Sequence, residues 1–341
     1  MNILFHVTTL LPEMPQAEAI TQEVTALQAR FGGDVVYVNP NPQSPLYVPR
    51  LLFGFHRLRE LQSREAGFQL HHLYNPDPFP FPYLHRLRRP VVYSITCGVD
   101  ERRPNVGFFS SLAAVAVSDE RSLKQLRAWG LENGVLVHPG IDTARFTCAR
   151  LPLRSDITLM VGSAPWTKGQ FRTKGVDALL QAAKQAPHLR LVFLWRGVLA
   201  DAMEHRVRQM KLAEQVTVLN ELVDVNQVLA GAHASITLAA ATGIVKSYPH
   251  SLLESLAAGK PVLVSQAIPM ADYVARAGCG VVVESVSPED VLTAVETLAR
   301  DYESLQQAAQ GVGQVDFSQT AMLASFQRVY ERVLGCGMIR S

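Results

Sequence analysis

The residues of this chain best suited to chemistry lie between Lys246 and Ser265, where one carboxylate stands among apolar and small side chains. That carboxylate, Glu254, is predicted to fall midway along a short helix that Gly259 ends. The leucines around it recur at helical spacing, so one side of the helix is expected to be buried. A carboxylate in such a helix either faces solvent or accepts hydrogen bonds from the hydroxyls of a ligand.

The start of the same helix is a second chemical feature. Pro249 suits a first helical turn, and Ser247 just before it can cap that turn. A helix N-terminus offers backbone N–H groups and the positive end of a dipole, which is where a phosphate or a sugar hydroxyl would bind. Pro261 prevents the helix from continuing, and residues 262–264 are predicted to form a buried parallel strand.

This pattern resembles the donor-binding motif of the retaining glycosyltransferases of family 4, which have the GT-B fold. In that family two glutamates lie eight positions apart around a Gly-Phe-Pro-like loop, and the second binds the ribose hydroxyls of a nucleotide sugar. Glu254 matches the second glutamate, and Ser247, Tyr248 and Pro249 match the loop. Lys246 stands where the family has the first glutamate. A lysine there could pair with the carboxylate of a uronic acid, contact a phosphate, or point into water.

A basic loop after the predicted strand at residues 157–161 is where the resemblance implies phosphate binding. Family members use a Gly-Arg start and a Lys-Gly helix start, and the arginine and lysine neutralise the pyrophosphate of the donor. Lys174 matches the lysine, whereas Ser163, which follows Gly162, occupies the place of the arginine. Two phosphates at a helix N-terminus call for such cations.

Other cations of this region could make up for the missing arginine. Lys168 and Arg172 lie in the same loop, and Arg196 follows the next predicted strand. Ligands of doubly wound sheets collect at the carboxyl ends of strands, although each of these charges could also be solvated. The resemblance implies a catalytic set of Lys174, Arg196 and Lys246. It implies a donor-binding set of Gly162, Ser163, Lys168, Ser247, Tyr248, Pro249, His250 and Glu254.

The N-terminal half offers two further candidates. Thr96 follows a predicted strand at the place of a family histidine that faces the donor sugar. Its hydroxyl can donate a hydrogen bond but cannot act as a base near neutral pH. Residues 46–66 interleave apolar residues with arginines, so an amphipathic basic helix is predicted there. Such a helix could lie on an anionic membrane, or it could pack on the sheet with its arginines solvated.

Strands and helices alternate along the whole chain, which predicts an α/β fold of two doubly wound, Rossmann-like domains facing a cleft. Its 341 residues suffice for two cores. Residues 1–150 are expected to form the N-terminal, acceptor-side domain and residues 151–317 the donor-binding domain. A last helix, 318–334, is expected to pack back on the first domain, as the family's terminal segment does.

Composition narrows the classes of function. The chain is 48% hydrophobic and 18% charged, and its formal net charge of +2 argues against a nucleic-acid-binding domain. The four cysteines are widely spaced, which is typical of reduced thiols rather than of a zinc site. The N-terminus lacks the basic start of a signal peptide, and no apolar run reaches the roughly 20 residues of a membrane helix. We therefore expect a cytoplasmic protein, with at most peripheral contact to the inner membrane.

The implied reaction moves a sugar from a nucleotide-sugar donor to a hydroxyl of a carbohydrate, lipid or other acceptor, with retention at the anomeric carbon. The sequence has no D-x-D carboxylate pair, so no metal and no cofactor besides the donor substrate is expected. A binding protein that lost catalysis is an alternative, because Lys246, Ser163 and Thr96 all depart from the family. A two-domain nucleotide-sugar epimerase and a membrane-associated scaffold are two further alternatives for the function.

Overall fold

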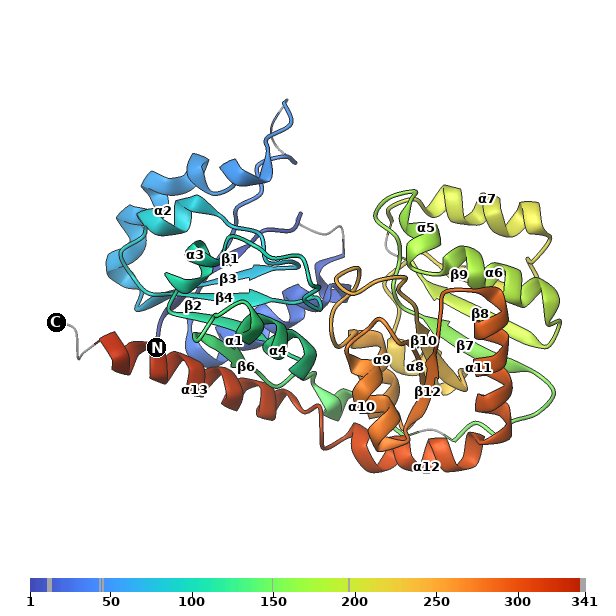
Figure 1. Ribbon diagram of the computed structural model, residues 1–341. Helices are drawn as coiled ribbons and strands as arrows, with labels where there is room; N and C mark the ends of the chain where they lie inside the picture. The colour runs from blue at the N-terminus through green and yellow to red at the C-terminus, as the bar shows by residue number, and fades with distance from the viewer. Residues whose placement is uncertain (11–13, 43, 45, 149, 196, 338–341) are drawn as a thin grey trace. The chain divides into compact units, whose positions relative to one another are not determined.

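The structure is a computed structural model that describes residues 1–10, 14–42, 44, 46–148, 150–195 and 197–337. The chain divides into two compact units, Met1–His138 with Thr320–Ser341 and Pro139–Gln319. Each unit is built around a six-stranded parallel sheet with helices on its faces (Figure 1). The predicted fold class, two doubly wound α/β sheets, is confirmed.

The sheet of the first unit has the strand order β2-β1-β3-β4-β5-β6. Every residue of β1, β3 and β4 is buried, so these strands do not alternate between apolar and polar residues, and β3 buries the polar residues His71, His72 and Asn75. The strands are β1 (Ile3–Val7), β2 (Gly33–Tyr37), β3 (Leu70–Asn75), β4 (Val91–Ile95), β5 (Ala114–Val117) and β6 (Gly134–Leu136).

Two apolar clusters cover the two faces of this sheet. One contains residues from α1 (Ala19–Phe31) and α13 (Gln319–Gly337), so the last helix of the chain completes the core of the first unit. The other contains residues from α2 (Leu58–Arg64), α3 (Val106–Ser110) and α4 (Glu120–Ala128). Figure 1 shows α13 in red beside the helices of the first unit.

The prediction of one amphipathic helix over residues 46–66 is wrong. Only α2 is α-helical there, and it follows two short 3₁₀ turns at Arg50–Leu52 and Phe55–Arg57. Gly54 separates the turns with a φ of +82°, and a Cβ at this position would overlap the Tyr83 ring. The chain must therefore bend at Gly54, where a continuous helix would run straight.

The sheet of the second unit has the order β12-β11-β10-β7-β8-β9. Its strands are β7 (Ile157–Val161), β8 (Leu189–Leu194), β9 (Val216–Leu219), β10 (Ala234–Thr237), β11 (Val262–Ser265) and β12 (Gly280–Val283). Its helices are α5 (Gln170–Thr173), α6 (Val176–Gln185), α7 (Ala200–Met210), α8 (Val225–Ala230), α9 (His250–Ala257), α10 (Met270–Ala277), α11 (Pro288–Arg300) and α12 (Tyr302–Gly313).

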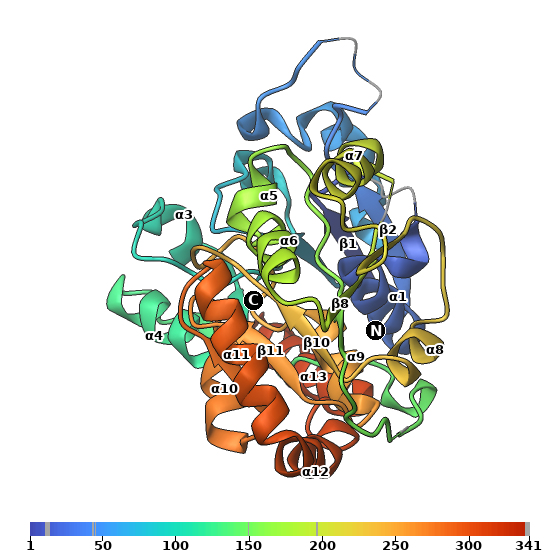
Figure 2. The same cartoon turned by 90° about the vertical axis from the view of Figure 1, so that its right-hand side faces the viewer.

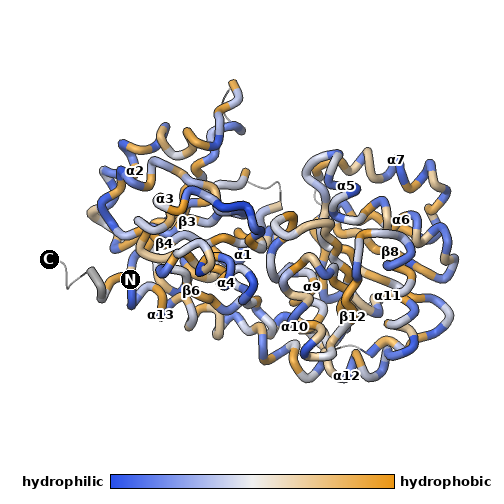
Figure 3. The backbone as a smooth tube through the Cα atoms, in the orientation of Figure 1, coloured by the Kyte–Doolittle hydropathy of each residue, from blue (hydrophilic) through white to orange (hydrophobic). Residues whose placement is uncertain are grey.

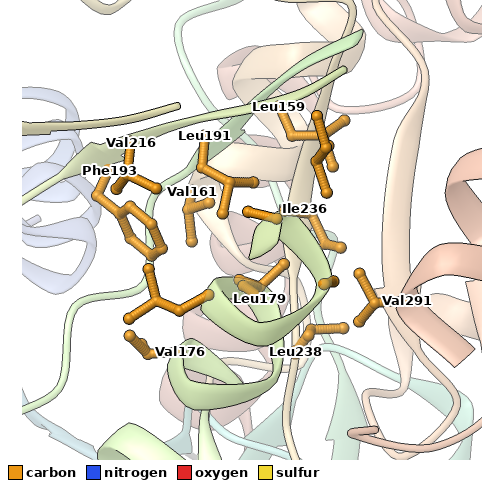
Figure 4. Close-up of a cluster of buried hydrophobic side chains, with 14 of the residues drawn as sticks. Leu159, Val161, Val176, Leu179, Leu191, Phe193, Val216, Ile236, Leu238 and Val291 are labelled. Atoms are coloured by element: carbon orange, nitrogen blue, oxygen red, sulfur yellow. The ribbon is translucent and has the colours of Figure 1, made fainter. Parts of the chain in front are cut away.

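The largest core of this unit lies between the sheet and the pair α6 and α11, which pack side by side on one face (Figure 2). Leu179 and Leu191 are among its fully buried side chains (Figure 4). Helices α9, α10 and α12 contribute to the core of the other face. Within the described ranges, no helix has both the length and the apolar character needed to cross a membrane.

Candidate functional site

The strand order of the second sheet reverses between β7 and β10, because the chain goes from β7 to β8 on one side and reaches β10 on the other. Ligands of open parallel sheets bind outside the carboxyl ends of the strands at such a point. The residues that follow β7 there are Gly162, Ser163 and Ala164, and α9 begins close to them.

Gly162 lies directly against the first turn of α9. A Cβ at this position would overlap the side chain of Ser251, so only glycine allows the loop after β7 to approach the helix this closely. The Ser251 hydroxyl also lies 3.4 Å from the Thr237 hydroxyl at the end of β10. These contacts fix the N-terminus of α9 at the switch point of the sheet.

Helix α9 begins one residue later than expected. Pro249 is the N-cap, so Ser247, two positions before it, does not cap the helix as predicted. The Pro249 carbonyl accepts hydrogen bonds from the N–H groups of Leu252 and Leu253, at 3.0 and 3.2 Å. Ser247 is instead fully buried, and its carbonyl accepts from Met270 N at 3.1 Å. The loop before α9 is thereby tied to the start of α10.

Glu254 is the one residue of α9 that is not buried; the other seven are. The helix ends as the sequence predicted, with Gly259 in the left-handed region at a φ of +68°. Tyr248 and Lys246 are partly exposed, whereas Pro249 and His250 are buried. Glu254 is therefore the carboxylate of this helix that a ligand hydroxyl could reach.

Lys174, which lies just before α6, contacts the same loop after β7. It is 8% exposed, and its Nζ donates a 3.0 Å hydrogen bond to the Ala164 carbonyl. Gly175 follows at a φ of +72°, packed so tightly against Leu238 that a Cβ would come within 2.6 Å of that side chain. This turn starts α6 and positions the ammonium group of Lys174 beside the loop that follows β7.

The other cations that the sequence offers for phosphate binding are less closely held at this loop than Lys174. Lys168 and Arg172 are exposed, on the loop and on α5. Arg196 lies outside the described residues. Among the residues that are described, no group of three or more His, Cys, Asp or Glu side chains could hold a metal ion.

Thr96 belongs to the first unit, where it follows β4. It is 6% exposed, and its Oγ1 has no hydrogen-bond partner among the residues that the structure describes. Its backbone N–H donates to the Asn75 carbonyl at 3.0 Å. A buried hydroxyl without a partner costs stability unless a water or a ligand satisfies it.

Next to Thr96, the structure shows a polar network that the sequence analysis did not find. Asp77 accepts hydrogen bonds from the Arg50 guanidinium, at 3.0 and 2.5 Å, and from the Asn75 amide at 2.7 Å. The Thr8 hydroxyl donates to Asn75 Oδ1 at 2.5 Å. Thr8 follows β1 and Asn75 is the last residue of β3, and the first sheet has its own switch point between these two strands. The sequence signal for this network was the polar pair Asn75 and Asp77, at the end of a buried strand and just after it.

Comparison with protein families gives the second unit a specific assignment. The family model of the glycosyl transferases group 1 matches residues 150–312. This part of the chain is a group 1 glycosyltransferase domain. The sequence resemblance to retaining glycosyltransferases of family 4 is thereby confirmed. A search of curated protein sequences gave no match.

Solved structures extend the likeness of the glycosyltransferase domain to nearly the whole chain. HepE from Anabaena, in complex with UDP, is 14% identical and gives a TM-score of 0.71, covering 97% of this chain and all of its own. Sucrose-phosphate synthase from Thermosynechococcus elongatus is 14% identical, with a TM-score of 0.72 over 98% and 100% of the two chains. WaaG, a glycosyltransferase involved in lipopolysaccharide biosynthesis, is 13% identical, with a TM-score of 0.68 over 97% and 99%. The fold is GT-B.

Proposed function

We propose that this glycosyltransferase moves a hexose-type sugar from a nucleotide-sugar donor to an acceptor hydroxyl with retention at the anomeric carbon and without a metal ion. The observation that carries the proposal is the meeting of Gly162, Lys174 and the N-terminus of α9 at the switch point of the second sheet. HepE was crystallised with UDP and with UDP-glucose, which makes a uridine nucleotide the first donor to test.

Each residue of the site would bind the part of the donor that its chemistry fits. The ammonium group of Lys174 would stabilise the charge that develops on the departing diphosphate, assisted by Arg196. Such preorganised charge is worth most in a poorly hydrated site, and Lys174 is largely buried. Glu254, the partly exposed carboxylate of α9, would accept hydrogen bonds from the ribose hydroxyls. Ser163, Lys168, Tyr248 and His250 would line the same site.

Lys246 would set the choice of sugar. It replaces an acidic residue with a cation, and a cation pairs with a carboxylated or phosphorylated group rather than with neutral hydroxyls. We expect Lys246→Glu to lower the use of a nucleotide-linked uronic acid relative to the neutral hexose. An unchanged ratio of kcat/KM for the two donors would exclude this role.

The first experiment is a thermal-shift panel of nucleoside diphosphates and nucleotide sugars on the wild type, Glu254→Ala and Glu296→Ala. Glu296 is an exposed glutamate of α11 and serves as the matched control. A ligand at a hundred times its Kd stabilises the folded state by about 2.7 kcal/mol. We expect one nucleotide to stabilise the wild type and Glu296→Ala, but not Glu254→Ala. Stabilisation without turnover of any donor would favour the catalytically degenerate binding protein.

For the partner on the acceptor side, we propose a peripheral contact with anionic lipid through the first unit. Five large apolar side chains are exposed within ten residues: Leu46, Tyr47, Leu51, Leu52 and Phe55. Exposed arginines at positions 59, 86, 88 and 89 accompany them, and Gln62 of α2 donates to the Arg86 carbonyl at 2.8 Å, which holds the two segments together. The alternation of apolar and charged stretches can be followed in Figure 3. Apolar and basic residues together fit the surface of an anionic bilayer.

Vesicle sedimentation tests this contact. We expect binding to vesicles that contain phosphatidylglycerol, weaker binding to pure phosphatidylcholine, and loss of binding in the double variant Leu51→Glu and Leu52→Glu. Leu222→Glu, at an exposed leucine of the second unit, is the control. Equal binding of all three proteins, or equal binding to both kinds of vesicle, would refute the contact.

A further inference from the structure

Lys260 is a buried lysine that the glycosyl transfer does not use. It follows α9 and precedes β11, and its backbone is fixed because its N–H donates to the Ser255 carbonyl at 2.9 Å. The side chain is 0% exposed, and no described atom accepts a hydrogen bond from its Nζ. Burial lowers the pKa of this amine from 10.5 to about 8. A buried amine without a partner is destabilising in its charged form, so its chemistry needs an explanation.

The thiol of Cys148 lies at the same place. Its Sγ is 3.0 Å from where a Cβ on Gly259 would stand, one residue before Lys260, and 3.9 Å from the Ala257 carbonyl. Cys148 is exposed, whereas Lys260 is covered. Burial lowers the pKa of Lys260, and the negative charge of a Cys148 thiolate acts in the opposite direction by favouring the ammonium form. An oxidant from solvent therefore reaches the thiol, whereas the amine of Lys260, the residue after Gly259, is covered.

His233 is the other titratable group that interacts with Lys260. It precedes β10, which pairs with β11 in register Ser235 to Val262, so His233 and Lys260 stand at neighbouring amino ends. Its Nδ1 accepts a 3.0 Å hydrogen bond from Thr158 N. Burial and the charge of Lys260 both lower the pKa of His233, so its imidazole is neutral near pH 7 and adds no positive charge beside Lys260.

We propose that a hydroperoxide converts Cys148 and Lys260 into a covalent sulfur–nitrogen cross-link. In the first step the Cys148 thiol loses its proton and the thiolate sulfur attacks the peroxide. The O–O bond breaks, Cys148 becomes a sulfenic acid, and the displaced oxygen takes up a proton and leaves as water, or as an alcohol from an organic peroxide. In the second step the lone pair of neutral Lys260 Nζ attacks that sulfur, the S–O bond breaks, and the hydroxyl group leaves with an amine proton as water. Sulfur loses two electrons to the peroxide, and the pair loses two hydrogens in total.

The cross-link would remove the cost of the buried amine, because the nitrogen in it carries no charge. It would also tie residue 148 to the C-terminal end of α9, the helix that carries Glu254. A thiol reductant would reverse it, since the sulfur–nitrogen bond is attacked by thiols as a disulfide is. The site is thus a reversible oxidation site, separate from the nucleotide-binding residues.

The test is mass spectrometry of the intact protein and of its peptides after treatment with hydrogen peroxide. We expect a loss of two hydrogens, a peptide pair joined through Cys148 and Lys260, and recovery of the original mass with dithiothreitol. The fraction of the sulfenic acid that goes on to the cross-link should rise with pH around 8, the pKa of the buried amine, rather than around 10.5. Lys260→Arg, which keeps the charge but is not nucleophilic near neutral pH, should stop at the sulfenic acid trapped by dimedone.

Several outcomes would overturn the proposal. One is a wild-type protein that stops at the dimedone adduct at pH 9; another is a disulfide between two chains. The same loss of two hydrogens in Lys260→Arg would assign the nitrogen to another group. Cys148→Ser changes an exposed side chain and provides a control that does not depend on how well the lysine variant folds. Nucleotide binding is not part of the measurement, so its failure would leave this result unaffected.

Discussion

Acid sensitivity of the first unit follows from the burial of His72. This residue of β3 is fully buried, with Nδ1 2.7 Å from the Tyr330 hydroxyl and Nε2 2.8 Å from the Ser94 hydroxyl. Burial lowers the pKa of its imidazole from 6.5 to about 3. The folded protein therefore keeps His72 neutral at a pH where the unfolded chain protonates it.

The sign and size of the effect follow from proton linkage. Below pH 6.5 the unfolded state binds a proton that the folded state does not, so the free energy of unfolding falls as the pH falls. For one such histidine, the loss between the ordinary pKa and two units below it is about 2 kcal/mol. It reaches about 4 kcal/mol at the folded pKa of about 3. His6 and His71 also have lowered pKa values, through burial, and add to the same trend.

The perturbation is His72→Gln, which keeps a polar side chain for Tyr330 and Ser94 but does not titrate. We expect it to be less stable than the wild type at pH 7, because it replaces two well-placed hydrogen bonds. Denaturant unfolding at several pH values should show a difference that shrinks by about 2 kcal/mol by pH 4.5. His205→Gln, at an exposed position of α7, is the control for the change of residue. A wild-type pH dependence retained in His72→Gln would refute the reasoning.

Three further predictions concern the second unit. Lys174→Met should lower kcat by roughly 100-fold to 1,000-fold, because it removes charge from the leaving diphosphate; unchanged kcat in a donor-turnover assay would exclude the role. Gly162→Ala should destabilise the protein by about 1–3 kcal/mol and weaken nucleotide binding, since the new Cβ overlaps Ser251; equal thermal shifts with nucleotide for variant and wild type would contradict this. Leu179→Ala, in the buried core of α6, should cost about 2–5 kcal/mol in chemical denaturation with little change in KM for the donor, whereas a large change in KM would show that this core also shapes the site.

Local patterns in the sequence were enough to predict the elements around α9. The apolar spacing of the leucines, Gly259 and the following Pro261 specify a helix, a stop and a strand within about twenty residues, and the structure has α9 and β11 there. The exact start was wrong, because Pro249 fits an N-cap as well as a first turn. Such choices depend on neighbours distant in sequence, here on Met270, which holds the loop before the helix.

Features that depend on distant contacts were not predicted. The bend at Gly54 is set by the Tyr83 ring, and the Arg50–Asp77 pair joins residues 27 positions apart. The spacing of residues near Gly54 and Arg50 does not indicate that Tyr83 and Asp77 are their partners. The same holds for the burial of Lys260 and for the approach of Cys148 to Gly259, which no local pattern shows.

Helix α13 has a consequence for the order in which the protein can fold during synthesis. Met322, Phe326 and Tyr330 fill the core of the first unit, yet they leave the ribosome after the whole second unit. Until then the apolar face that includes Ile20 and Val24 has no cover from this helix. Domains usually fold as they emerge, N-terminal first. Here the first unit is synthesised first but cannot complete its core until α13 has been synthesised. It is therefore exposed to chaperones and proteases for longer than the second unit.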